Sequence, residues 1–400
     1  MTRTFPPALY LASLCLLPAA AQAELLGPFT VHVGAGLEHD SNVLRTPSGQ
    51  EISDQVGSMS VGVKGNKEYG LQRFRLDAEA TRYRYQNLTD LNYSTVNYLA
   101  AWDWQVTPRF QGVLSATRTQ YRDVSRFTDI SGVERAAGTG GLTQRNEVLE
   151  GRYLIDGPWR VLGGFSHNST TSQDARRDIG VPLDASPSVR SVRVGAAYEF
   201  ASGSEFTARV RRGNGEYKDL PAALGGNIGF RETETEFGLK WPITAKTTLD
   251  GRVAYLQRTH SGNGALDFSG PVGEGNVTYL VTAKTRVLAG VSSELDSYQL
   301  GSPGHIRSTR VYVRPIYKPT EKTEVSLHYV HENREFSGAW AGSLDDGRRD
   351  TSQWVTAGFG YQALRNVSLA ATLRYERRTS NVSFGNYRDV TAGGSVSVGF

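Results

Sequence analysis

Cysteine is nearly absent from this chain of 400 residues, which has only Cys15. Everything beyond the first two dozen residues therefore lacks the means to form a disulfide or a thiolate metal site. Long apolar runs are missing too, because no later stretch approaches the ~20 apolar residues of a transmembrane helix. Of the seven histidines, His328 and His331 are three apart, which on a strand means opposite faces. The sequence predicts no metal and no cofactor.

A strong charge of one sign is also lacking. Lys and Arg total 44 and Asp and Glu total 40, so the formal net charge is only +4. The arginines alternate with acidic residues instead of forming a basic stripe, which excludes a nucleic-acid partner. The mean hydropathy is negative, at -0.39, yet Tyr (19), Phe (15) and Gly (44) are abundant. Such a composition is unlike that of a disordered polar chain, which is poor in aromatic residues.

The first residues have the pattern of a secretory signal peptide. Arg3 provides a positive start, residues 8–17 form a short apolar run, and Ala21-Gln22-Ala23 is a typical cleavage site. We therefore predict a signal peptide over residues 1–23 and a single domain over residues 24–400. Cys15 belongs to the signal, and Leu14 before it is not the small residue expected at a lipid-anchor site.

One unit repeats along the rest of the chain: an alternating polar/apolar strand, a tight turn, a second such strand and a longer polar loop. The turns resemble one another, as in Thr244-Ala245-Lys246-Thr247 and Thr282-Ala283-Lys284-Thr285. The pattern predicts strands near 29–40, 55–66, 71–86, 93–105, 109–123, 144–156, 159–170, 189–200, 205–217, 229–241, 247–260, 272–282, 285–298, 306–317, 323–335, 352–362, 367–379 and 388–400. Repeated hairpins without helices predict an all-β fold, a closed transmembrane antiparallel β-barrel of about 18 strands in a bacterial outer membrane.

The alternation separates two faces. Phe74, Leu76 and Ala78 share one face, and a slip by one residue would move charges into lipid at ~2–4 kcal/mol per arginine near the midplane. The candidates for the lumen lining lie on the other face: Arg73, Arg75, Asp77, Glu79, Tyr83, Arg209, Arg211, Glu232, Glu234, Glu236, Arg374 and Glu376. Such residues either pair across strands to stiffen the wall or line a conduit for a hydrated polyhydroxyl solute. The two roles are compatible, and a barrel of this size encloses an aqueous channel.

Short and long connections alternate. Short periplasmic turns and longer external loops are typical of outer-membrane barrels, and an even strand count places both termini on the periplasmic side. The loop at 125–142 is among the longest. Its charged residues Arg126, Asp129, Glu134 and Arg135, with nearby Arg145, either fold into the mouth as a gate or form a solvated surface loop. We expect no periplasmic module, plug or passenger domain.

The segment from Gly36 to Arg45 ends in Asp40-Ser41-Asn42-Val43-Leu44-Arg45. It resembles the opening of the EpsL-type outer-membrane proteins, β-barrel porins encoded with exopolysaccharide genes. The resemblance implies export of a polysaccharide, periplasmic or inner-membrane synthesis and export partners, and no catalytic residues. A structural interpretation stays open, since Asp40, Ser41 and Asn42 bond readily to nearby backbone in a turn. The terminal Phe400, after Val396 and Val398, resembles the recognition signal of the barrel assembly machinery.

Three functions compete. The first is a non-enzymatic passage for an exopolysaccharide through outer-membrane lipid. The second is a general or sugar-selective diffusion porin. The third is a lipid-modifying barrel enzyme acting through His167 and Ser169, which a spacing of two places on one face of a strand. This face follows Phe165 on the lipid side, but the pair lies in a polar run that leaves the membrane.

Overall fold

The protein is an antiparallel β-barrel. The computed structural model describes residues 28–122, 127–128, 134–135, 141–172, 186–218, 228–262, 264, 267–297, 305–338, 346–382 and 385–400. The predicted signal peptide lies outside the described residues, as do Arg126 and Asp129. In the part of the chain described, no helix is both long and apolar enough to cross a membrane.

Eighteen strands form one sheet. The first nine are β1 (Phe29–Asp40), β2 (Asp54–Tyr69), β3 (Gln72–Tyr85), β4 (Tyr93–Thr107), β5 (Phe110–Arg122), β8 (Gly141–Asp156), β9 (Trp159–Ser172), β10 (Ser186–Glu199) and β11 (Glu205–Lys218). The others are β12 (Ile228–Thr244), β13 (Thr247–His260), β14 (Phe268–Leu280), β15 (Thr285–Ser297), β16 (His305–Thr320), β17 (Thr323–Ser337), β18 (Arg349–Leu364), β19 (Val367–Ser380) and β20 (Tyr387–Gly399). These bounds confirm the predicted strands.

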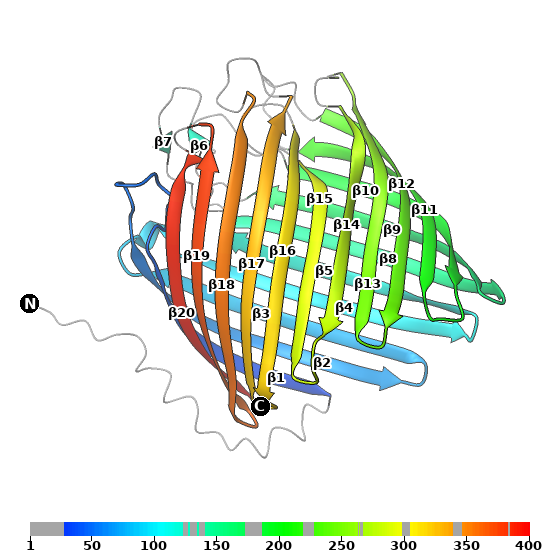
Figure 1. Cartoon of the computed structure of the whole chain (residues 1–400), viewed down its shortest axis with the longest axis horizontal. Helices are drawn as coiled ribbons and strands as arrows, with labels where there is room; N and C mark the ends of the chain where they lie inside the picture. Colours follow the sequence, from blue (N-terminus) through cyan, green and yellow to red (C-terminus); the bar gives the residue numbers. More distant parts are fainter. Residues whose placement is uncertain are drawn as a thin grey trace, which may run out of the picture.

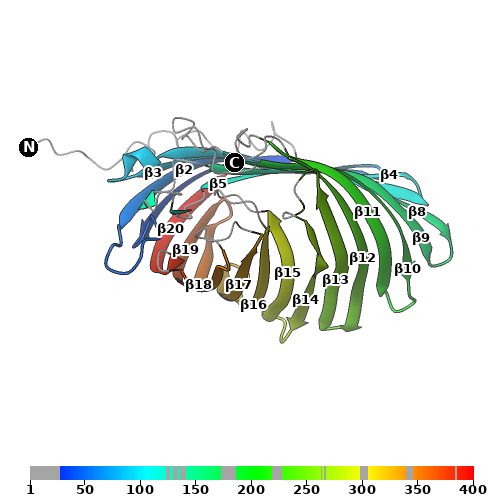
Figure 2. The same ribbon diagram turned by 90° about the horizontal axis from the view of Figure 1, so that it is seen from above.

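The sheet closes on itself because the last strand pairs with the first. Val33 of β1 lies opposite Val398 of β20, and the remaining neighbours pair in chain order. Closure leaves no unpaired edge in the barrel. Figure 1 shows the two termini of the barrel at the same end as the short turns. Seen from above, the cross-section is wider than it is deep (Figure 2).

The loop after β5 contains a feature that alternation does not reveal. β6 (Phe127–Thr128) and β7 (Glu134–Arg135) pair with each other as a separate two-stranded sheet. The sequence predicted only loop here, because two-residue strands are too short for a period-2 pattern. A short 3-10 helix, η2 (Thr89–Leu91), lies between β3 and β4.

Alternate residues of each strand face opposite sides of the wall, as the sequence predicted. In β12, Phe237 is 48% exposed and Trp241 45%, whereas Glu232 and Glu234 are 5% and 7% exposed. We call the apolar side the outward face and the polar side the inward face. A barrel in lipid has this arrangement because the apolar side contacts hydrocarbon, while the charged side chains pair with one another inside the barrel.

Candidate functional site

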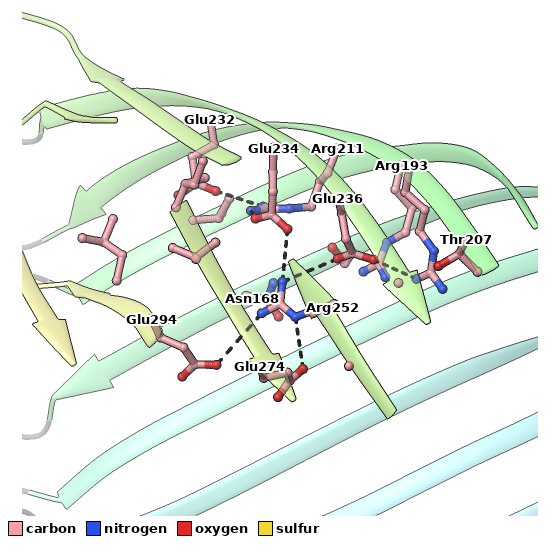
Figure 3. Close-up of a pocket in the computed structure, with 18 of the residues that line it drawn as sticks. Asn168, Arg193, Thr207, Arg211, Glu232, Glu234, Glu236, Arg252, Glu274 and Glu294 are labelled. Atoms are coloured by element: carbon pink, nitrogen blue, oxygen red, sulfur yellow. Dashed lines mark hydrogen bonds and ion pairs between the residues drawn. The ribbon is translucent and has the colours of Figure 1, made fainter. Parts of the chain in front are cut away.

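The inward face of β9 to β15 encloses a cavity of about 710 Å³. Its walls carry many charged groups of both signs. The charged lining residues are Arg193, Glu205, Arg209, Arg211, Glu232, Glu234, Glu236, Lys240, Asp250, Arg252, Arg258, Glu274 and Glu294. Figure 3 shows several of them directed toward one another across neighbouring strands.

Arg252 of β13 lies at the centre of this cluster (Figure 3). Its Nε donates to Glu274 of β14 at 3.1 Å. Its Nη1 lies 3.3 Å from Glu234 and 3.5 Å from Glu236, both on β12, and its Nη2 lies 4.0 Å from Glu294 of β15. One guanidinium therefore joins carboxylates from three other strands, because its fork of donors can serve several acceptors at once.

Arg211 of β11 makes two short contacts to β12. It lies directly opposite Glu234 in the register, and its two terminal nitrogens lie 2.6 Å from Glu234 and 2.9 Å from Glu232. Glu232 also accepts from Arg258 of β13 at 2.6 Å. These cross-strand pairs support the wall role for Arg211, Glu232 and Glu234, since each pair ties adjacent strands together.

Arg209 extends the cluster toward the short-turn end. Its Nη1 lies 3.7 Å from both Glu236 of β12 and Glu150 of β8. Arg209 also lines a second cavity of about 520 Å³ together with Arg73 and Asp103. The same side chain thus forms part of the wall of both cavities, so its position affects the space available in each.

The other predicted lining residues lie away from the larger cavity, in separate pairs. Arg75 binds Asp103 with two hydrogen bonds of 2.9 and 2.8 Å. The remaining contacts are Arg73 to Asn66 and Glu68, Asp77 to Lys64, Glu79 to His32, Tyr83 stacked on Tyr93, Arg374 to Glu376, and Glu376 to Tyr387. The structure therefore brings together Arg209, Arg211 and the three glutamates of β12, and leaves the residues of β3 and β19 elsewhere on the wall.

Sequence reasoning missed the centre of the cluster. Arg252 and Arg258 alternate with outward residues in β13, as the period-2 pattern requires, and this pattern could have identified them. The signal is weak because Ala254 and Leu256, on the same face, are apolar. They form a buried cluster with Val272 of β14, so the inward face is not uniformly polar.

The segment that suggested a family resemblance forms a buried turn. Asn42 is fully buried, and its amide bonds to the carbonyl oxygens of Thr46 and Arg388. Arg45 has a φ of 53° and contacts Asp40 at 2.9 Å and Asp389 at 3.3 Å. Burial lowers the pKa of Arg45, but the two carboxylates outweigh it and raise that pKa overall. The turn interpretation thus accounts for these residues through their contacts.

His167 lies on the outward face near the long-loop end, and its partner differs from the predicted one. Its Nδ1 lies 3.1 Å from Glu147 of β8, and its Nε2 lies 3.2 Å from the hydroxyl of Ser188 of β10. Ser169 lies opposite Arg145 and Ser188 in the register. The pairing of His167 with Ser188 follows from the neighbouring strand, which spacing within one strand could not reveal.

Throughout the described ranges, no group of three or more His, Cys, Asp or Glu side chains could hold a metal ion. The gate residues proposed in the loop at 125–142 lie outside the described side chains, except that Arg145 is exposed on β8.

Comparison with known families decides the identity of the barrel. The model of the family "Putative beta-barrel porin 2" matches residues 18–400. The chain belongs to this porin family. The porin matches none of the curated proteins.

Solved structures share the fold of this porin. One is OpdK of Pseudomonas aeruginosa with vanillate, at 12% sequence identity and a TM-score of 0.50, covering 94% of this chain and 100% of that one. Another is OccK2 (OpdF) of the same organism, at 11% identity and a TM-score of 0.50, covering 94% and 99%. At such low identity the likeness concerns the fold alone. Family and fold are those of an outer-membrane β-barrel porin, and the resemblance to EpsL-type proteins is not confirmed.

Proposed function

We propose that this porin is a passive diffusion channel for small hydrated solutes, with a preference for uncharged polyhydroxyl compounds of the sugar class. The observation that carries the proposal is the inward cavity of about 710 Å³ lined by paired arginines and glutamates. A volume in the range of ~300–1,000 Å³ suits a small molecule. Of the lining residues predicted from the sequence, Arg209, Arg211 and the three glutamates of β12 line this cavity, and we propose that they line the permeation path.

The charge balance supports a neutral solute. Cationic and anionic side chains are nearly equal in number around the cavity, and Arg211 and Arg252 each contact at least two carboxylates. Paired charges exert a weaker net field on a passing ion than an unpaired row of one sign. They still offer many hydrogen-bond donors and acceptors, which hydroxyl groups use.

Export of an exopolysaccharide is the narrower alternative, with periplasmic or inner-membrane synthesis proteins as partners. Its sequence evidence was the segment ending at Arg45. Those residues have a structural explanation, because Asn42, Arg45 and Asp389 hold the first and last strands together. Nothing in the cavity specifically favours a polymer over a small solute, so diffusion is the better-supported function.

The orientation we propose follows the loop lengths. The short turns and both termini face the periplasm, and the long loops face the exterior. In this orientation Glu147, His167 and Ser188 lie on the outward face at the outer leaflet. We assign them a structural role in tying β8, β9 and β10 together and not a catalytic one.

Osmotic swelling of liposomes tests the channel. Full-length protein reconstituted into phosphatidylcholine liposomes should admit a pentose faster than a hexose and a hexose faster than a disaccharide. A large dextran should stay excluded. Liposomes that swell in none of the sugars would overturn the proposal.

Two further measurements separate the alternatives. Deleting the protein from its cell should leave secreted polysaccharide unchanged if it is a diffusion porin and should abolish secretion if it is an exporter. Ser188→Ala and Ser169→Ala should leave the acylation of outer-membrane lipid unchanged. A loss of lipid deacylation in Ser188→Ala would instead establish the enzymatic function.

A further inference from the structure

Arginines on the outward face gather at the long-loop end of the barrel. On one side of the wall these are Arg190 of β10, Arg212 of β11 and Arg231 of β12, and on another Arg377 of β19 and Arg388 of β20. All five are exposed. Arg190, Arg231, Arg377 and Arg388 lie within four residues of the strand end opposite the short turns, whereas Arg212 lies midway along β11. We call these five residues the outward arginine belt.

The register establishes that they face outward. Arg190 shares the face of Val192 and Val194, which are 46% and 60% exposed. Arg377 likewise follows Leu373 and Tyr375, at 53% and 44% exposed. Arg190, Arg231, Arg377 and Arg388 therefore lie where the apolar band of the wall ends, and Arg212 lies opposite Val192 at the edge of that band. In a bilayer, this is the depth at which hydrocarbon gives way to headgroups.

The belt differs from the inward arginines in its partners. Arg211, Arg252 and Arg374 on the inward face each have a carboxylate within 3.3 Å. Among the described residues, no belt arginine has a carboxylate at ion-pair distance. Two carboxylates lie near the belt on this face: Glu147, which contacts His167, and Glu216 of β11, which lies opposite Ser188 and Gly229 in the register. The guanidinium groups of the belt thus make no ion pair within the part of the chain that the structure describes.

The belt also places like charges next to one another. Arg377 lies directly opposite Arg388. Asn214 lies opposite both Arg190 and Arg231, and Arg212 is two residues away on the same face of β11. Like charges that face each other across strands destabilise a sheet. An anion bound between them would remove this repulsion.

Phosphate matches the belt in charge and shape. A guanidinium presents two parallel N–H groups to a phosphate and prefers such bidentate contacts. We propose that the outward arginine belt binds the phosphate groups of phosphorylated glycolipid headgroups in the outer leaflet. This inference rests on the orientation proposed above, because it needs the long loops to face the exterior. It concerns the outward surface and leaves the channel itself unchanged.

Lipid retention tests the belt. Full-length protein in detergent is incubated with diphosphorylated lipid A and with phosphatidylcholine, washed, and assayed for each bound lipid by native mass spectrometry. The wild type should retain lipid A in preference to phosphatidylcholine. The variants Arg190→Gln/Arg212→Gln/Arg231→Gln and Arg377→Gln/Arg388→Gln should each retain several-fold less. Thr233→Gln, a neutral change on the same face, should behave as the wild type.

Two outcomes are decisive. Equal lipid A retention by wild type and both arginine variants would overturn the proposal. So would displacement of lipid A by inorganic phosphate alone, since free phosphate would then suffice. Heat-modifiable gel migration shows whether each variant is folded. If a glutamine variant does not fold, the corresponding Arg→Lys variant replaces it, and this variant should retain part of the lipid.

Channel conductance separates this inference from the proposed function. Conductance should be the same in wild type and both arginine variants, because the belt lies outside the lumen. A wild type that conducts nothing but retains lipid A would refute the channel and keep the belt. A wild type that conducts but shows no preference for lipid A would refute the lipid-binding role of the belt and keep the channel.

Discussion

The guanidinium of Arg45 lies 3.3 Å from the carboxylate of Asp389, and so connects the turn after the first strand to the last strand. Asp389 is 1% exposed and also accepts from the backbone N–H of Asn42 and the hydroxyl of Ser41. Residues from opposite ends of the barrel sequence thus converge on one carboxylate. The contact secures the seam at which the barrel closes.

Asp389→Ala should destabilise the barrel. Removing one partner of a buried ion pair costs about 3–5 kcal/mol, since the remaining charge loses its compensation. Unfolding in urea, followed by tryptophan fluorescence of the detergent-folded protein, should show a lower midpoint. Glu321→Ala, in an exposed short turn, provides the control and should leave the midpoint unchanged. Equal midpoints for both variants would show that the seam does not depend on Asp389.

Arg252→Ala should shift the ion selectivity of the channel toward cations. The change removes the positive charge that Glu234, Glu236 and Glu274 share, so the cavity becomes more negative. The reversal potential in a planar bilayer under a salt gradient measures this shift. Arg212→Ala removes the same charge from the outward face and should leave the reversal potential unchanged. A wild-type potential in Arg252→Ala would place the ion path away from this cluster.

Gly195→Ala should disturb the wall, because the backbones of β10 and β11 approach closely at this point. A Cβ at residue 195 would lie 2.3 Å from the carbonyl oxygen of Ala208 and 2.8 Å from Arg209. Such overpacking costs ~1–3 kcal/mol. Gly163→Ala is the matched control, since no atom lies within 4 Å of a Cβ there. Thermal unfolding monitored by circular dichroism should show a lower melting temperature for Gly195→Ala than for Gly163→Ala. Equal melting temperatures would contradict the close approach of the two backbones.

Phe400→Ala tests the proposed contact with the barrel assembly machinery. The backbone of Phe400 pairs with Val31 through hydrogen bonds of 2.8 and 3.2 Å, and these bonds do not need the aromatic ring. We therefore expect less assembled barrel in cells but unchanged stability after refolding in detergent. Val398→Ala controls for the loss of an outward apolar side chain. Normal assembly of Phe400→Ala would exclude the ring as a signal.

The strands were predictable because each one keeps a strict two-residue period over a wall with lipid on one side. The predicted strand at 247–260 coincides with β13. β14 begins at Phe268, four residues before the predicted start. The prediction began late because the segment Phe268-Ser269-Gly270-Pro271 contains a glycine and a proline. Glycine and proline usually mark a turn, but this barrel accommodates both within a strand.

The candidate site was predictable only in part. Alternation identified Arg209, Arg211 and the glutamates of β12 as sharing one face. It could not show that Arg252 would join them, because that contact depends on the register of β13 and on the curvature of the wall. The partner of His167 was missed for the same reason. Contacts between strands are set by long-range pairing, on which a local pattern carries no information.

Closure by pairing β20 with β1 has a consequence for biogenesis. Without β20, the sheet has two free edges whose N–H and C=O groups can pair with another chain. A protein truncated before Tyr387 would keep those edges permanently and should aggregate or be degraded. Closure therefore depends on β20, and this one strand decides whether the wall has exposed edges.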